Sequence, residues 1–159
     1  MCDYSLMTVP NRLAANGEEL IVHRFQEGSI GLASAFEIRL EQASRKLRLQ
    51  GFWPKLKEFF RPKAEGIPAV CIPPGSRLLI RDIPQNVHGE WGVQKSVAEA
   101  VFTQMTAEEF RHRDAVCFGS GTIVLLQRLM EGQRVRVVSV SSEEELQTEP
   151  EFGISERMR

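Results

Sequence analysis

The spacing of hydrophobic residues along this chain predicts a set of short β-strands. Over residues 19–25, Leu20 and Val22 alternate with Ile21 and His23, which is the two-residue period of a half-buried strand. Similar runs, about ten residues apart, lie at residues 29–33, 69–72, 77–83, 96–105, 114–118, 122–127 and 134–140. Residues 96–105 also hold the alanines and glutamates of a helix, but their alternation favours a strand. The pattern predicts a mainly β (α+β) fold, a small antiparallel sandwich or partly closed barrel.

Between residues 35 and 62 the hydrophobic period changes to that of an α-helix. An apolar face repeats at intervals of three and four residues in each of two segments. The first face consists of Phe36, Leu40, Ala43 and Leu47, and the second of Phe52, Leu56, Phe59 and Phe60. Gly51 suits the end of the first helix, Pro54 the first turn of the second, and Pro62 its end. Residues 35–62 are therefore predicted to form a helical hairpin inserted between strands.

The composition is typical of a globular protein with one domain. The 159 residues are 42% hydrophobic and 26% charged, with a net charge of −1. We expect one β-rich domain over residues 1–140, followed by an acidic, mobile tail at residues 141–159. The start of the chain lacks the apolar run of a signal peptide, and the longest aliphatic run, at residues 123–126, is too short to span a bilayer. The cytoplasm is the expected location, with attachment at the periphery of a membrane as a further option.

Charge is unevenly distributed along the chain. Residues 39–63 hold eight basic side chains against two glutamates, a net charge of +6, which leaves −7 for the rest. A net charge near zero argues against a general nucleic-acid binder, so no nucleic acid is expected as a partner. The basic segment also carries bulky aromatic residues, a pattern typical of helices that lie on a membrane or dock in a partner's groove.

The aromatic and basic part of the predicted hairpin is the candidate binding surface. Its members are Phe52, Trp53, Lys55, Lys57, Phe59, Phe60 and Arg61. They are predicted to bind either a protein partner or an anionic membrane surface. The alternative is that the aromatic side chains cap one end of the β core while the lysines stay in solvent.

No catalytic or cofactor motif is present, so the candidate chemistry depends on cysteine and histidine. Cys2, Cys71 and Cys117 are an odd number at scattered spacings, which does not suggest a disulfide framework. Cys2, His23 and Cys71, together with His112, offer the thiolate and imidazole ligands that zinc or iron prefers. The alternative makes Cys71 and Cys117 small buried hydrophobes in a reducing compartment, and His23 and His88 hydrogen-bonded structural residues.

Cys2 also raises the question of nucleophilic catalysis. If the initiator methionine is removed, the thiol and the free α-amine share one residue, and the amine can act as a general base. N-terminal-nucleophile hydrolases use that arrangement. Their layered sheets and long helices do not fit a chain with so little helix, so a hydrolase is the weaker alternative.

Parts of the sequence resemble a known family. The opening MCDYSL, followed by NRLA, VHRF and GSIGLAS, is similar to the start of an uncharacterised bacterial protein family, and the AVCIPPG segment shares some likeness. The resemblance covers about the first 34 residues. It implies a bacterial cytoplasmic protein and no particular activity. The helical hairpin is atypical of that family, which implies an insertion with a role of its own.

These observations favour a binding or regulatory module over an enzyme. The aromatic and basic insertion is the predicted surface for a partner or membrane. A metal-binding or thiol-dependent protein that uses Cys2, His23 and Cys71 is the alternative from a different class. The sequence leaves the oligomeric state open.

Overall fold

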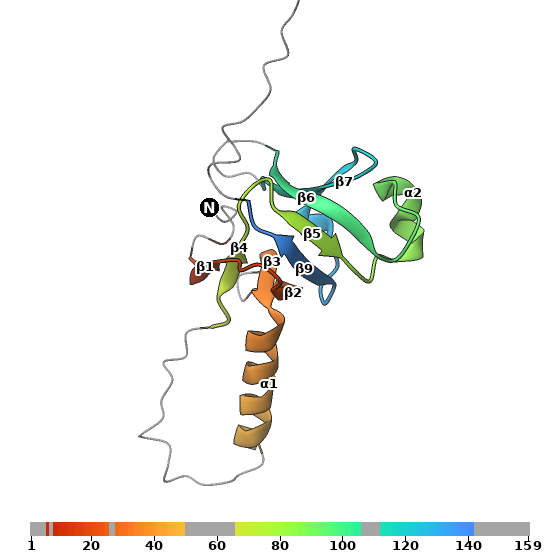
Figure 1. Cartoon of the computed structure of the whole chain (residues 1–159). Helices are drawn as coiled ribbons and strands as arrows, with labels where there is room; N and C mark the ends of the chain where they lie inside the picture. Colours follow the sequence, from red (N-terminus) through yellow and green to blue (C-terminus); the bar gives the residue numbers. More distant parts are fainter. Residues whose placement is uncertain (1–5, 7, 26–27, 50–65, 106–111, 142–159) are drawn as a thin grey trace, which may run out of the picture.

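The computed structural model describes residues 6, 8–25, 28–49, 66–105 and 112–141. Two sheets and two α-helices account for most of this part of the chain (Figure 1). The strands are β1 (Asn11–Leu13), β2 (Glu19–Arg24), β3 (Ile30–Ser34), β4 (Ala69–Cys71), β5 (Arg77–Ile80), β6 (Ala98–Gln104), β7 (Asp114–Phe118), β8 (Ile123–Leu125) and β9 (Arg134–Ser139). The helices are α1 (Ala35–Leu49) and α2 (His88–Trp91).

The main sheet is antiparallel and has seven strands in the order β3-β2-β9-β5-β6-β7-β8. Its local hairpins agree with the alternation in the sequence: Leu20 pairs with Ser34 in β2–β3, and Ala100 pairs with Phe118 in β6–β7. The sheet does not close into a barrel. The predicted mainly β class is therefore confirmed, and residues 98–104 form a strand.

One face of the main sheet builds the principal core. Alternate residues of its central strands, such as Leu20, Leu78 and Val135, are completely buried. The residues between them point outward, so Arg134 and Arg136 of β9 reach solvent. Trp91 of α2 enters this core and stacks on Phe118, with ring centroids 5.9 Å apart.

A second, smaller sheet pairs β1 with β4 in parallel. Asn11 is opposite Ala69 and Leu13 is opposite Cys71. The hydrophobic pattern does not predict β1, because this strand is only three residues long and its partner lies far along the chain. This pairing places the N-terminal part of the chain beside the strand that follows the insertion.

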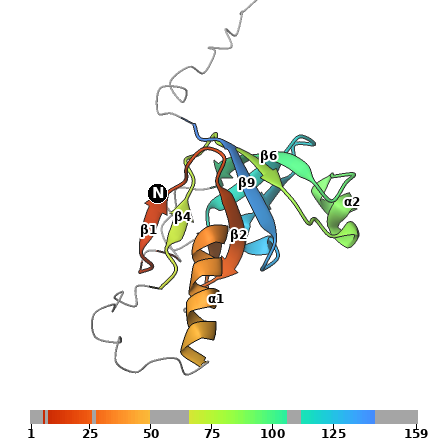
Figure 2. The same cartoon turned by 60° about the horizontal axis from the view of Figure 1, so that its bottom comes forward.

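Helix α1 starts directly after β3 and projects away from both sheets (Figures 1 and 2). Its base closes a small second core made of Leu6, Phe25, Ala33, Ile38 and Ala69. The second half of the predicted hairpin, at residues 52–61, lies outside the described residues, as does the tail beyond Ser141. No helix in the described ranges has both the length and the apolar character needed to cross a membrane.

Helix α2 lies between β5 and β6. The residues HGEW form one helical turn, which ends at Gly92 in the left-handed conformation with φ of 64°. A Cβ at this position would lie 2.5 Å from the hydroxyl oxygen of Ser120. Glycine is therefore required at residue 92 both for its backbone conformation and for the close approach of Ser120.

Candidate docking surface

Local sequence explains why residues 35–49 are helical. Glu37 lies in the first turn, where the helix dipole favours a negative charge. One turn of spacing brings Glu41 and Arg45 into an ion pair with an N–O distance of 2.6 Å. The hydroxyl of Ser44 donates to the carbonyl oxygen of Leu40 at 2.9 Å. These interactions need no contact with the sheet, so the helix continues beyond the point where it leaves the protein body.

The base of α1 is fixed by apolar and polar contacts. Ala35 and Ile38 are buried, and Ile38 packs in the small core with Phe25 and Leu6. Next to Ile38 in the sequence, Glu37 accepts a hydrogen bond from Nε of the Arg12 guanidinium at 3.2 Å. The first turn of α1 therefore has a fixed position relative to both sheets.

Arg12 joins three parts of the chain. Besides Glu37 it donates to Glu18 from two nitrogens, at 2.5 and 3.2 Å. The hydrogen bond to Glu18 raises the pKa of Arg12 above its ordinary value, although burial acts in the opposite direction. Burial would raise the pKa of Glu18, but hydrogen bonds from Arg12 and from the Ala15 N–H hold that pKa below its ordinary value. Both groups are therefore ionised at neutral pH.

The outward face of α1 is apolar and exposed. The side chains of Phe36 and Leu40 are 71% and 57% exposed, and Ala43 on the same stripe is exposed as well. The buried Ile38 is two positions from both Phe36 and Leu40, about 200° away around the helix. The helix thus has two apolar faces, of which the described part of the protein covers only one. We call Phe36, Leu40 and Ala43 the outward stripe.

Basic side chains accompany the outward stripe. Arg39 and Lys46 are exposed, and neither forms an ion pair within the described residues. Both lie on the same flank of the stripe, about 60–80° from Phe36 at roughly 100° per residue. Glu37 and Glu41, in contrast, are engaged by Arg12 and Arg45. The uncompensated charge next to the stripe is therefore positive.

A groove of about 690 Å³ lies on the other side of α1, between the helix and β2. His23, Phe25, Ile38 and Gln42 contribute to its wall. The His23 and Phe25 rings meet edge to face, with centroids 4.9 Å apart. Its charged residues are paired with one another, Arg24 with Glu131 at 3.2 Å and Arg45 with Glu41. The described residues that line the groove therefore offer no surplus charge for a ligand, unlike the outward stripe.

The residues predicted to bind a partner or membrane fall outside the described ranges. They are Phe52, Trp53, Lys55, Lys57, Phe59, Phe60 and Arg61. The described structure instead contributes Phe36, Leu40, Arg39 and Lys46, which precede them on the same insertion. Their helical spacing was visible in the sequence, but spacing alone does not distinguish an exposed face from a buried one.

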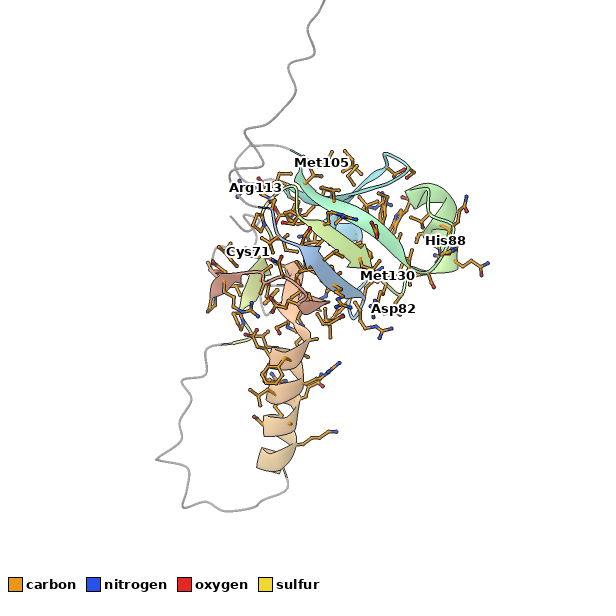
Figure 3. The ribbon with its side chains drawn as sticks, viewed as in Figure 1. Cys71, Asp82, His88, Met105, Arg113 and Met130 are labelled. Carbon is orange, nitrogen blue, oxygen red and sulfur yellow. The ribbon has the colours of Figure 1, made fainter. Side chains whose placement is uncertain are left out.

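The candidate metal ligands are only partly described. Cys2 lies outside the described residues, while His23 and Cys71 lie on β2 and β4, in different sheets. Cys71 is disulfide-bonded (its position is labelled in Figure 3), so a metal site built from Cys2, His23 and Cys71 stays a prediction that would need Cys71 in its reduced form. A thiolate binds a metal, whereas a disulfide sulfur lacks that charge. Among the described residues, no group of three His, Cys, Asp or Glu side chains could hold a metal ion.

The other cysteine and histidine expectations concern single residues. Cys117 is a free thiol on β7 and is only partly buried. The Nε2 atom of His88 lies 3.2 Å from the carbonyl oxygen of Ile83, in agreement with a hydrogen-bonded structural role. Neither residue adds to the surface on α1.

Comparison of the chain with protein-family models, with curated proteins and with solved structures gives no match.

Proposed function

We propose that this protein is a non-catalytic binding module that attaches to an anionic membrane surface through its inserted, basic segment. The contact would begin on the outward stripe of α1 and continue through the aromatic and basic residues 52–61. The observation that carries the proposal is the exposure of Phe36 and Leu40 on a helix whose opposite face is already packed.

Apolar side chains provide the first part of the proposed attraction. Full burial of an exposed phenylalanine or leucine side chain is favourable by about 1.5–3 kcal/mol. At a membrane interface such side chains enter the acyl boundary while the rest of the helix remains in the headgroups. Residues 52–60 add three phenylalanines and one tryptophan to the same insertion. Tryptophan is favoured at this depth because its ring is apolar and its N–H is polar.

Charge provides the second part of the proposed attraction, and its sign favours an anionic surface. The insertion carries +6 over residues 39–63, while the rest of the chain carries −7. An anionic surface therefore attracts this segment and repels the remainder, which orients the molecule. Each basic residue near such a surface contributes about 1 kcal/mol at physiological salt. This arrangement supports reversible attachment without a membrane-spanning helix.

Vesicle co-sedimentation tests the proposal. The full chain is mixed with vesicles of phosphatidylcholine containing about one third phosphatidylserine, or with phosphatidylcholine alone. We expect binding only to the anionic vesicles. Phe36→Ala/Leu40→Ala should weaken this binding at least about tenfold, because two apolar side chains no longer enter the interface. Arg39→Gln/Lys46→Gln should weaken it by roughly 5–30-fold, because two positive charges are lost.

Matched substitutions elsewhere on the surface serve as controls. Val101 and Ile123 are exposed apolar residues of the main sheet, and Val101→Ala/Ile123→Ala should bind as the wild type does. Lys95→Gln is the corresponding charge control. A variant with Trp53→Ala and Phe59→Ala examines the sequence-predicted part of the surface. Absence of binding to anionic vesicles, or unchanged binding of the Phe36/Leu40 and Trp53/Phe59 variants, contradicts the membrane proposal and leaves a protein partner as the alternative.

A further inference from the structure

Strand β8 forms one edge of the main sheet. It pairs with β7 on one side, and no described strand pairs with its other side. The β7–β8 hairpin turns through Gly121, which has φ of 83°, and the Phe118 N–H donates to the carbonyl oxygen of Thr122 at 2.9 Å. An unpaired strand edge presents backbone groups that can pair with another chain. Within the described ranges, one side of β8 is therefore available for a further strand.

The hydrogen-bond pattern of the hairpin identifies the backbone groups at this edge. The bond between Phe118 and Thr122 marks a hydrogen-bonded position, and such positions alternate along an antiparallel ladder. Cys117 and Ile123 are the next pair, so the N–H and the carbonyl of Ile123 point away from β7. A residue that presents both a donor and an acceptor can pair with the identical residue of a second chain.

Strand β8 lacks charge and proline, two features that commonly prevent strand edges from associating. Residues 119–126 have the sequence GSGTIVLL, which holds neither a charged residue nor a proline. The other edge of the main sheet, β3, is partly covered, because Nε2 of Gln127 donates to the carbonyl oxygen of Ile30 at 2.9 Å. Of the two edges, β8 is therefore the less protected.

Apolar side chains form a row that leads to the β8 edge on the outward face of the sheet. Val101 of β6 is opposite Cys117 of β7, which in turn is opposite Ile123 of β8. The side chains of Val101 and Ile123 are 42% and 47% exposed, and Cys117 is partly buried. Two copies paired along β8 would join two such rows into one, and each Ile123 side chain would cover the other.

The distribution of charge favours a second copy of the chain as the partner. In a two-fold contact each surface meets itself, so a charged strand would face its own charge. Strand β8 carries no charge. The first charged residue along the row is Arg77 of β5, and its guanidinium is paired with Glu99 at 3.0 Å. The net charge of −1 also means that two copies repel each other little at long range.

We propose that two copies of this chain associate through β8, which pairs antiparallel with β8 of the partner around a two-fold axis at Ile123. The N–H of each Ile123 donates to the carbonyl oxygen of the other, so the two main sheets become one continuous sheet. A three-residue strand gives a small contact, and such contacts belong to the transient class of interfaces. The outward stripe of α1 is not part of this contact, so the inference does not depend on the membrane proposal.

Sedimentation of the full chain without lipid tests the proposal. Between about 1 µM and 1 mM, we expect the average mass to rise from one chain to two chains and no further. Ile123→Lys places two like charges beside each other and should raise the dimer dissociation constant at least about tenfold. Ile123→Pro should also abolish the dimer, because it removes the N–H at the open edge, where a proline is tolerated.

Val101→Lys is the matched control, since Val101 has a similar exposure on the same face but lies on an interior strand. Five strand spacings would separate the two introduced charges, about 24 Å, which exceeds the Debye length at physiological salt. This variant should dimerise as the wild type does. A chain that remains monomeric, a mass that grows beyond two chains, or equal dissociation constants for Ile123→Lys and Val101→Lys overturns the proposal.

Amide exchange resolved by residue tests the position of the contact. Exchange at Ile123 should slow as the concentration rises into the range of the dimer, because its N–H becomes hydrogen-bonded. The Val124 N–H faces β7 and should exchange at the same rate at all concentrations. If the mass doubles while exchange at Ile123 stays constant, the contact lies elsewhere and the proposal is wrong.

Discussion

At the scale of single residues, Arg12 shows how one side chain can hold several elements together. Its guanidinium reaches Glu18 just before β2 and Glu37 in the first turn of α1, while its backbone belongs to β1. The side chain of Glu18 is 15% exposed and that of Arg12 is 36% exposed. The Arg12–Glu18 ion pair is thus sheltered enough to contribute to stability, but screening by solvent reduces that contribution.

The depressed pKa of Glu18 gives this cluster a predictable response to acid. Because the folded pKa lies below the ordinary value of 4.5, the ionised carboxylate stabilises the fold. That contribution is complete above pH 4.5 and disappears as the pH falls through the folded pKa. Glu18→Gln should lower the free energy of unfolding at pH 7 by about 1 kcal/mol, after allowance for the exposure of Arg12.

The same substitution should flatten the fall in stability below pH 4.5, as followed by denaturant unfolding at several pH values. Glu131→Gln is the control, because Glu131 pairs with Arg24 where both side chains are half-exposed. An acid response in Glu18→Gln equal to that of the wild type would show that the Arg12 cluster does not control it.

At the scale of elements, the sequence best predicts the strands, turns and helix ends that depend on residues close together in the chain. The β2–β3 and β7–β8 hairpins and the start of α1 agree with the sequence, because their periodicity and turns are local signals. Strand β1 has three residues and pairs with β4 across the whole insertion, so no local pattern could reveal it. The disulfide state of Cys71 likewise depends on proximity in space rather than on spacing in the chain.

The sequence predicts helix α1, but only the structure shows which of its apolar faces packs against the sheets. Both of its faces hold apolar residues, Phe36 and Leu40 on one and Ala35 and Ile38 on the other. The described members of the longer apolar run, Phe36, Leu40 and Ala43, are the exposed ones. What decides the orientation is the small core, where Phe25 and Leu6 accept Ile38.

A pair of substitutions on α1 should therefore have opposite consequences. Ile38→Ala removes a side chain that is 8% exposed and should lower the free energy of unfolding by about 2–4 kcal/mol. Phe36→Ala removes an exposed side chain and should change it by less than about 0.5 kcal/mol. Chemical denaturation at neutral pH measures both. A loss for Phe36→Ala as large as that for Ile38→Ala would mean that the outward stripe is covered within the molecule, which would contradict its role in docking.

At the scale of the whole molecule, the described part of the chain combines a β body with the start of the basic insertion that we propose to bind a membrane. The main sheet has no role in the proposed contact, and its outward arginines are paired with carboxylates, as Arg134 is with Asp82 at 2.6 Å. Helix α1 leaves the β body on one side, and α2 lies far from α1 in both views (Figures 1 and 2). Attraction of the insertion and repulsion of the acidic remainder should give one preferred orientation on an anionic surface.

The fluorescence of the two tryptophans tests that orientation. Trp53 belongs to the insertion, whereas Trp91 is buried in the core on α2, stacked on Phe118. On anionic vesicles that contain brominated lipid, we expect quenching of the Trp53 emission and none of the Trp91 emission, because bromine quenches only fluorophores at lipid depth. Trp53→Phe leaves Trp91 as the remaining tryptophan and should abolish the response. High salt should also remove it, since the Debye length falls from about 10 Å at 0.1 M to 3 Å at 1 M. Persistent quenching in Trp53→Phe would place α2 at the membrane instead, and the proposed orientation would be wrong.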